Sequence, residues 1–155
     1  MVNIINMQKK ADIPKGLCRL LRRYCYSSLW YEDIFVDTEI TIIFTDNDYI
    51  RKLNLKTRGI DAATDVLSFP MYDNQGLDDK FVRGDRYNLG DMFINLEWAN
   101  NLQLNCGKNF NDEVLLLAVH SMLHLLGYDH ENFLTRKVMF GVQKKILKRC
   151  KNMPF

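Results

Sequence analysis

Hydrophobic and polar positions along the chain follow two different periods, and these periods divide it into predicted strands and helices. Alternating or β-branched runs predict four strands. These are Val2–Ile5, Glu39–Thr45, Val66–Phe69 and Leu89–Asn95. We expect the first strand at a sheet edge and the second at the centre of the sheet. Pro70 is expected to close the third strand, because proline cannot donate to a sheet ladder.

Apolar residues spaced by three or four positions predict five helices. The first is expected to carry Pro14 in its first turn and to extend to about Leu29. Asp46 and Asn95 are the predicted caps of the second and third helices, because their side chains can accept from free N–H groups. Gly107 is the predicted stop of the third helix.

The fourth predicted helix is apolar on nearly every side, so we expect it to be the central, buried helix of the fold. Its predicted cap is Asn111 or Asp112. The fifth helix is predicted to run to about Lys148. Its expected core contacts are Phe133, Val138, Val142 and Ile146 or Leu147.

The resulting order is strand, helix, strand, helix, two strands and three helices. It predicts an α+β fold, with a small mixed sheet of about four strands packed against about five helices. Residues 1–155 are expected to form one domain. The polar stretch from Tyr72 to Asn88 is predicted to be an exposed loop or hairpin connection.

Composition limits the classes of protein to be considered. Hydrophobic residues make up 47% and charged residues 26%, which is typical of a soluble globular protein. No apolar run has the length of a membrane span, and the N-terminus lacks the pattern of a signal peptide. We therefore expect a cytoplasmic protein with no membrane partner. The four cysteines form no Cys-x-x-Cys pair, so neither a disulfide framework nor a second metal site is expected.

Basic residues gather near both ends of the chain, although the net charge is only +2. They are Lys9, Lys10, Lys15, Arg19, Arg22 and Arg23 near the start, and Lys144, Lys145, Lys148, Arg149 and Lys151 near the end. Such runs are commonly solvated helix faces, and composition slightly favours that interpretation. The alternative is a surface that attracts phosphate groups.

All three histidines of the chain, His120, His124 and His130, fall within eleven residues. Positions i and i+4 of a helix lie on one face, so His120 and His124 can bind one metal ion. Gly127 permits a left-handed turn that would bring His130 back to the same point. Three imidazoles are the protein half of a catalytic zinc site. The alternative is a set of buried histidines, each of which would need its own hydrogen-bond partner.

Ser121 occupies the position at which His-Glu-x-x-His metalloproteases carry their general base. A zincin-type metalloprotease remains an alternative on the histidine spacing, but a serine hydroxyl is a poor base. A second alternative is a non-catalytic protein with a structural zinc. Such a zinc normally has four protein ligands, and only Asp129 or a distant cysteine could supply the fourth.

A second polar cluster lies between a predicted helix and a predicted strand. It comprises Asn54, Arg58, Asp61, Thr64, Asp65 and Ser68. Threonine and aspartate suit a capped turn, so the run could be purely structural. Arg58 is the member that a turn least requires, and its guanidinium suits bidentate recognition of phosphate.

These two clusters, with Leu89-Gly90-Asp91 between them, resemble the YbeY family of bacterial endoribonucleases over most of the chain. The resemblance implies a zinc-dependent endoribonuclease directed at single-stranded RNA. It implies a role in ribosomal RNA maturation, notably of the small-subunit RNA 3′ end, and in ribosome quality control. The implied partners are ribosomal RNA and the small ribosomal subunit with its proteins.

The resemblance also implies roles for individual residues. One Zn²⁺ per chain would be bound by His120, His124 and His130, and the catalytic residues would be Arg58 and His120. Asp129 and Glu131 flank His130 and are candidates for the general base or for contacts around the ligands, although both could be ordinary loop carboxylates. The chain departs from the family at two positions. Ser121 replaces a usual glycine and could narrow the pocket, and Thr57 replaces a usual aromatic residue beside Arg58.

Overall fold

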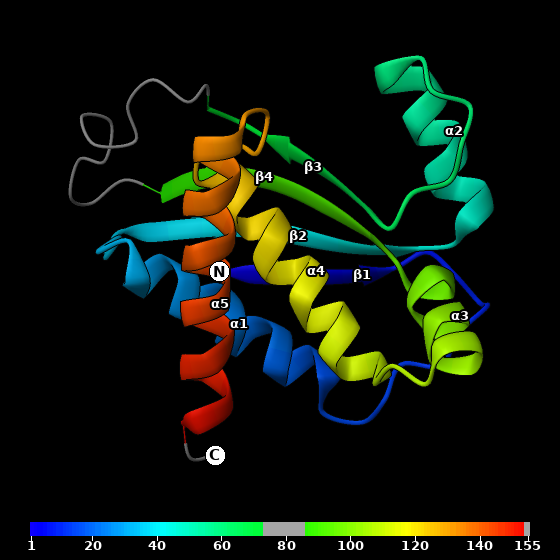
Figure 1. Ribbon diagram of the computed structural model, residues 1–155, viewed down its shortest axis with the longest axis horizontal. Helices are drawn as coiled ribbons and strands as arrows, with labels where there is room; N and C mark the ends of the chain where they lie inside the picture. Colours follow the sequence, from blue (N-terminus) through cyan, green and yellow to red (C-terminus); the bar gives the residue numbers. More distant parts are fainter. Residues whose placement is uncertain (73–85, 154–155) are drawn as a thin grey trace.

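The computed structural model describes residues 1–72 and 86–153, and these residues form four strands and five helices in the predicted order (Figure 1). The strands are β1 (Val2–Asn6), β2 (Asp37–Thr45), β3 (Val66–Pro70) and β4 (Arg86–Asn95). The helices are α1 (Leu17–Tyr31), α2 (Asn47–Arg58), α3 (Leu96–Cys106), α4 (Phe110–Leu125) and α5 (Phe133–Asn152). The predicted α+β class is confirmed. Most of the predicted connection from Tyr72 to Asn88 lies outside the described residues.

The four strands form one mixed sheet in the order β1-β2-β4-β3. β1, β2 and β4 are parallel, and β3 runs antiparallel to β4. The edge position of β1 and the central position of β2 are therefore as predicted. Pro70 ends β3, an edge strand, where its missing N–H leaves no neighbour unsatisfied.

Gly90 lies in β4 at a position that tolerates no side chain. The register between β2 and β4 shifts there, since Glu39 pairs with Asn88 and Ile40 with Gly90. Gly90 has a φ of +130°, and a Cβ atom on it would lie 2.1 Å from the carbonyl oxygen of Phe69. Only glycine allows β3 to approach the bulged strand this closely.

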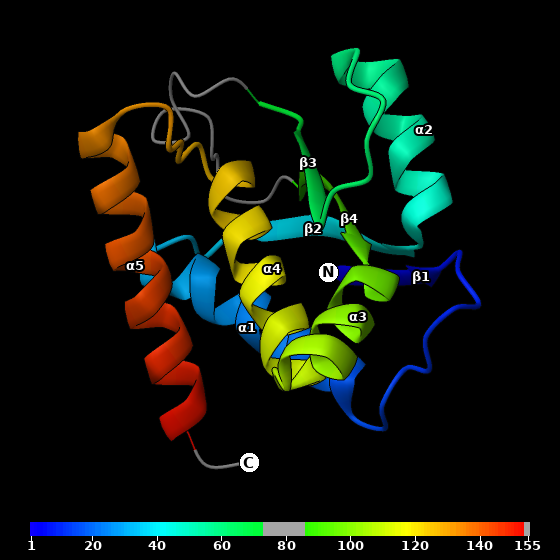
Figure 2. The same cartoon turned by 45° about the vertical axis from the view of Figure 1, so that its right-hand side comes forward.

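Helix α4 is the centre of the fold, as its apolar sequence predicts. It packs on β3 and β4, with α1 and α3 beside it and α5 against both α1 and α4 (Figure 2). Val114, Ala118 and Met122 are almost completely buried. On the opposite face of β4, Phe93 stacks with Tyr49 of α2 at a centroid distance of 6.2 Å. This arrangement places the C-terminal end of α4, with its histidines, beside β3.

The predicted starts of two helices are wrong by a few residues. Helix α1 begins at Leu17 after the left-handed Gly16, so Pro14 precedes the helix and accepts a bond from the Leu17 N–H. Helix α4 is capped by Asn109, whose side chain accepts from the Asp112 N–H. The cap is therefore neither Asn111 nor Asp112. As predicted, Asp46 and Asn95 cap the starts of α2 and α3, and Gly107 caps the end of α3.

Two predicted core contacts of α5 are also wrong. Phe133 is 78% exposed and Val138 is 57% exposed, because the first two turns of α5 present them away from α1 and α4. The buried residues of α5 are Met139, Ile146 and Cys150. None of the described helices is both long and apolar enough to cross a membrane.

A three-histidine site in a cleft beside α4

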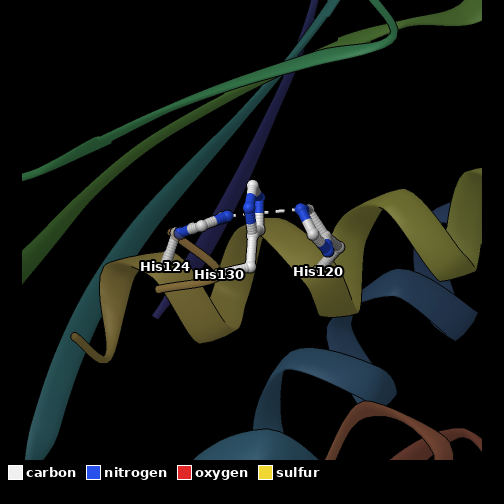
Figure 3. A group of neighbouring side chains, drawn as sticks. All are labelled: His120, His124 and His130. Atoms are coloured by element: carbon white, nitrogen blue, oxygen red, sulfur yellow. Dashed lines mark hydrogen bonds between the residues drawn. The ribbon is translucent and has the colours of Figure 1, made fainter. Parts of the chain in front are cut away.

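The last turn and a half of α4 and the loop after it bring the three histidines together (Figure 3). His120 and His124 lie one turn apart on the face of α4 that points to the cleft. Gly127 has a φ of +90°, so the chain reverses after α4 and returns His130 to the other two rings. One nitrogen from each imidazole lies within 4.8 Å of the others. The sequence prediction that these residues converge is confirmed.

The hydrogen bonds around two of the rings aim their free nitrogens at one point. Nδ1 of His124 lies 2.9 Å from the carbonyl oxygen of Tyr128, so it must carry the proton and donate. Nδ1 of His120 lies 3.0 Å from Oε1 of Gln143. Each ring therefore carries its proton on Nδ1, and its Nε2 atom has a free lone pair. The two Nε2 atoms lie 3.2 Å apart and face each other. Two ligands on one tetrahedral zinc ion are separated by about 3.3 Å, so this pair fits a shared metal ion.

The surroundings of the rings favour neutral imidazoles, the form that binds metal. Burial lowers the pKa of His124 to about 4, and the neighbouring His120 and His130 rings and Arg58 act in the same direction. Burial also lowers the pKa of His120. The Nε2 atoms of His120 and His124 are therefore available near neutral pH without loss of a proton.

The loop that carries His130 is anchored at two places. Tyr128 donates its backbone N–H to the Leu123 carbonyl oxygen and its hydroxyl to Oε1 of Glu32, at 2.9 and 2.8 Å. Burial raises the pKa of this phenol, so it remains a donor. Oδ1 of Asp129 accepts from the Glu131 N–H at 3.1 Å. Hydrogen bonds from Thr135 and from this N–H hold the pKa of Asp129 below its usual value.

The histidines open into a cleft of about 490 Å³ between α4, its following loop, β3 and the end of α2. Its lining also includes Arg58, Asp129 and Glu131, and from β3 and the segment before it Thr64, Asp65, Val66, Ser68 and Pro70. Arg58 ends α2, where Gly59 turns the chain with a φ of +71°. Among the described residues Arg58 has no ion-pair partner. Its guanidinium is therefore available to an anion in the cleft.

Two members of the predicted polar cluster serve the fold instead of the cleft. Asn54 is buried and donates to the Ala62 carbonyl oxygen at 2.9 Å. Asp61 forms a bidentate pair with Arg51, at 2.7 and 2.9 Å. These contacts fix the turn after α2, and this turn positions Arg58.

Ser121 does not narrow the cleft. Its side chain is fully buried and its Oγ lies 2.6 Å from Oγ of Ser68, so it connects α4 to β3 beneath the site. Thr57 is exposed, and its hydroxyl donates to the Leu53 carbonyl oxygen within α2. Neither residue removes a ligand nitrogen.

Two contacts of the site have no signal in the sequence. Gln143 lies 23 positions after His120, on another helix, and glutamine is usually a surface residue. The Tyr128 contact with His124 uses a backbone carbonyl, so residue type carries no information about it. Both contacts depend on how α5 and the loop pack on α4.

An α+β fold with three converging imidazoles in a cleft defines the class of protein as one with a histidine metal-binding site. Comparisons with known proteins give the family. The family model described as Endoribonuclease YbeY matches residues 3–151. The chain therefore belongs to the YbeY family, and the resemblance of its motifs is confirmed.

Relatives in several bacteria match nearly the whole chain. The Endoribonuclease YbeY of Caldanaerobacter subterraneus subsp. tengcongensis is 42% identical over 152 residues, which is 96% of each chain. That of Desulforamulus reducens is 38% identical over 148 residues, covering 96% of this chain and 95% of the relative. A solution structure of a protein from Thermotoga maritima has a TM-score of 0.62 and 26% identity, covering 97% of this chain and 89% of that one.

Proposed function

We propose that residues 1–155 act as a zinc-dependent endoribonuclease that cuts single-stranded RNA in the cleft beside α4. The observation that carries the proposal is the pair of Nε2 atoms 3.2 Å apart, in a cleft that also contains Arg58, which has no ion-pair partner within residues 1–72 and 86–153. Membership of an endoribonuclease family supports the reaction. We further propose ribosomal RNA, notably the 3′ end of the small-subunit RNA, as the substrate. Ribosome quality control, a cytoplasmic location and small-subunit partners belong to the same proposal.

Arg58 is the proposed phosphate-binding and catalytic residue. Its guanidinium would hold the scissile phosphate and stabilise the negative charge that develops during cleavage. His120, His124 and His130 would hold one zinc ion through neutral nitrogens. A bound zinc ion supplies Lewis acidity and lowers the pKa of a coordinated water. Gln143 and the Tyr128 carbonyl keep the ligand nitrogens turned toward the ion.

Of the two candidate bases, Glu131 is the better placed. Asp129 has one carboxylate oxygen occupied by the Glu131 N–H, which suits a role in holding the His130 loop. The Glu131 side chain lines the cleft and is exposed, so it could take a proton from a nucleophile. We therefore assign Asp129 to positioning and Glu131 to the candidate base.

The metalloprotease alternative lacks a base at the required place. Ser121 occupies the position of the zincin glutamate, but it is fully buried, does not line the cleft, and has its hydroxyl bonded to Ser68. The structural-zinc alternative needs a fourth ligand. In residues 1–72 and 86–153 the metal-binding group consists of the three histidines.

Purified protein reconstituted with zinc tests the proposal. We expect about one zinc per chain by elemental analysis, and loss of the ion in His124→Ala. The protein should cut single-stranded RNA and spare a fully paired duplex, and a chelator should stop cleavage. Equal cleavage of the duplex would contradict the proposed substrate class. Digestion of casein without cleavage of RNA would support the protease instead.

A further inference from the structure

A second groove runs along the molecule next to the metal cleft. It lies between α4 and α5, which are side by side in Figures 1 and 2, and has a volume of about 750 Å³. Leu115, Leu116 and Leu147 form much of its apolar floor. Lys144 and Lys148 of α5 lie on its rim. We call it the α4/α5 groove.

The α4/α5 groove meets the metal site at two residues. Phe140 lines the groove, and its ring centroid lies 6.2 Å from that of His120 and 6.3 Å from that of His130. Gln143 also lines the groove and is the hydrogen-bond partner of His120. Phe140 and Gln143 of the groove therefore lie next to His120 of the cleft. Phe140 is 46% exposed, which leaves part of its ring open to a ligand.

The charges on the groove leave an excess of positive groups. Its two acids are paired, Glu113 with Lys108 at 3.6 Å and Asp112 with Lys151 at 3.1 Å. Lys144 and Lys148 have no ion-pair partner among the described residues. They lie four positions apart on one face of α5, about 6 Å along the helix axis. Both side chains can therefore contact the same bound strand.

Two arginines near Lys144 and Lys148 are turned to other partners. Arg149 lies over the Trp30 ring, 3.5 Å from its centroid. From the N-terminal run, Arg23 donates to the carbonyl oxygens of Cys150 and Met153. The packing of α1 against α5 uses these two arginines and leaves Lys144 and Lys148 for an external anion.

We propose that the α4/α5 groove binds the part of a single-stranded RNA that extends beyond the cleft; this rests on the proposed function. The strand passes over Phe140, on which a base stacks, and Lys144 and Lys148 contact its phosphates. Base stacking on an aromatic ring combined with lysine–phosphate contacts is the usual basis of single-strand binding. A paired strand could not place a base on Phe140, so the groove also favours unpaired RNA.

Two oligoribonucleotides and two double variants test this inference. One RNA has about four nucleotides and occupies the cleft alone, and the other has about fifteen and reaches the groove. In Lys144→Glu/Lys148→Glu, the KM for the long RNA should rise about tenfold and the KM for the short RNA should stay the same. The slope of the logarithm of the binding constant of the long RNA against the logarithm of the salt concentration should also become less steep by about 1.4. Zinc content and melting temperature should not change.

Lys137→Glu/Lys145→Glu is the matched control, because it makes the same charge change on exposed positions of α5 outside the groove. Equal KM values of the two double variants for the long RNA would overturn the inference. A second outcome would also overturn the inference: Lys144→Glu/Lys148→Glu binds RNA as the wild type does but no longer binds polyglutamate. The groove would then be a docking surface for an acidic protein. Phe140→Ala should weaken binding of the long RNA at full zinc content, and Phe140→Trp should retain it.

The two proposals fail in different ways. If the wild-type protein cuts neither RNA, the proposed function is wrong. If it binds neither RNA by fluorescence anisotropy, the groove inference is wrong as well. If it cuts both RNAs and the groove variants match the control, only the groove inference is wrong.

Discussion

Oε1 of Gln143 on α5 lies 3.0 Å from Nδ1 of His120 on α4, so α5 determines which nitrogen of His120 is free to bind a metal ion. We predict that Gln143→Leu lowers zinc affinity about tenfold to hundredfold, because the ring loses the acceptor that fixes its tautomer. Gln143→Glu should retain the affinity, since a carboxylate also accepts the bond. Competition with a chromophoric chelator measures both constants.

The control for Gln143 is Gln103→Leu, an equivalent change on α3 away from the histidines. It should leave zinc affinity unchanged. Equal affinities of the Gln143→Leu and wild-type proteins would show that the bond does not orient His120. The Co²⁺-substituted proteins add a spectroscopic comparison, because a reoriented imidazole changes the ligand-field bands.

Removal of the metal should lower the melting temperature without unfolding the protein. The ion would connect the loop after Gly127 to α4, so its binding energy adds to folding stability. At a free zinc concentration a hundred times Kd, the gain is about 2.7 kcal/mol. The corresponding shift is about 5–10 °C for a chain of this size. Differential scanning fluorimetry with and without chelator measures it, and His124→Ala should show no shift.

Arg58→Glu should abolish most RNA cleavage, because it reverses the charge where a phosphate would bind. A loss of about a hundredfold in kcat/KM is expected for removal of one transition-state donor. Arg58→Lys should recover part of the activity, since a point charge lacks the bidentate fork. Zinc content and melting temperature should be close to those of the wild type.

Lys56→Glu is the control for Arg58, because Lys56 lies in the same last turn of α2 and is exposed outside the cleft. It should cleave RNA nearly as the wild type does. Wild-type activity of a folded Arg58→Glu protein would refute the role of Arg58. The melting curve must accompany each assay, so that misfolding is not mistaken for lost chemistry.

Gly90→Ala should destabilise the sheet. Its Cβ would lie 2.1 Å from the Phe69 carbonyl oxygen, at a φ of +130° that alanine adopts only with strain. We expect a loss of at least about 2 kcal/mol in the free energy of unfolding. Gly141→Ala on α5 is the control, because nothing lies within 4 Å of the added Cβ. That variant should be as stable as the wild type or up to about 1 kcal/mol more stable. Urea titration compares the two.

The sequence predicted the order of the elements because each has a clear period and most have distinctive ends. Asp46 and Asn95 each precede one clear run of helical spacing, and Gly107 follows one. At the start of α4 the actual cap, Asn109, lies close to the two predicted caps, Asn111 and Asp112, and all three are good capping residues. Sequence alone could not choose among them.

The site was predictable where its residues are close in the chain and distinctive in type. His120, His124 and His130 meet both conditions. Phe133 and Val138 are apolar, as core positions of a helix are, yet which face of α5 is buried depends on its angle to α1 and α4. Gln143 was missed for the same reason, because its role exists only once α5 is in place.

The bond between Tyr128 and Glu32 joins residues 96 positions apart, and this separation gives assembly of the site an order in time. His120 and His124 come into line as soon as α4 coils. We expect His130 to take its place when the loop after α4 reaches the end of α1, which closes a loop of 96 residues. Closing so long a loop costs conformational entropy before the contact offsets it, so we expect this contact to form after the local ones. The two-histidine half of the site should therefore exist before the third ligand arrives, which makes tight capture of the metal one of the last events in folding.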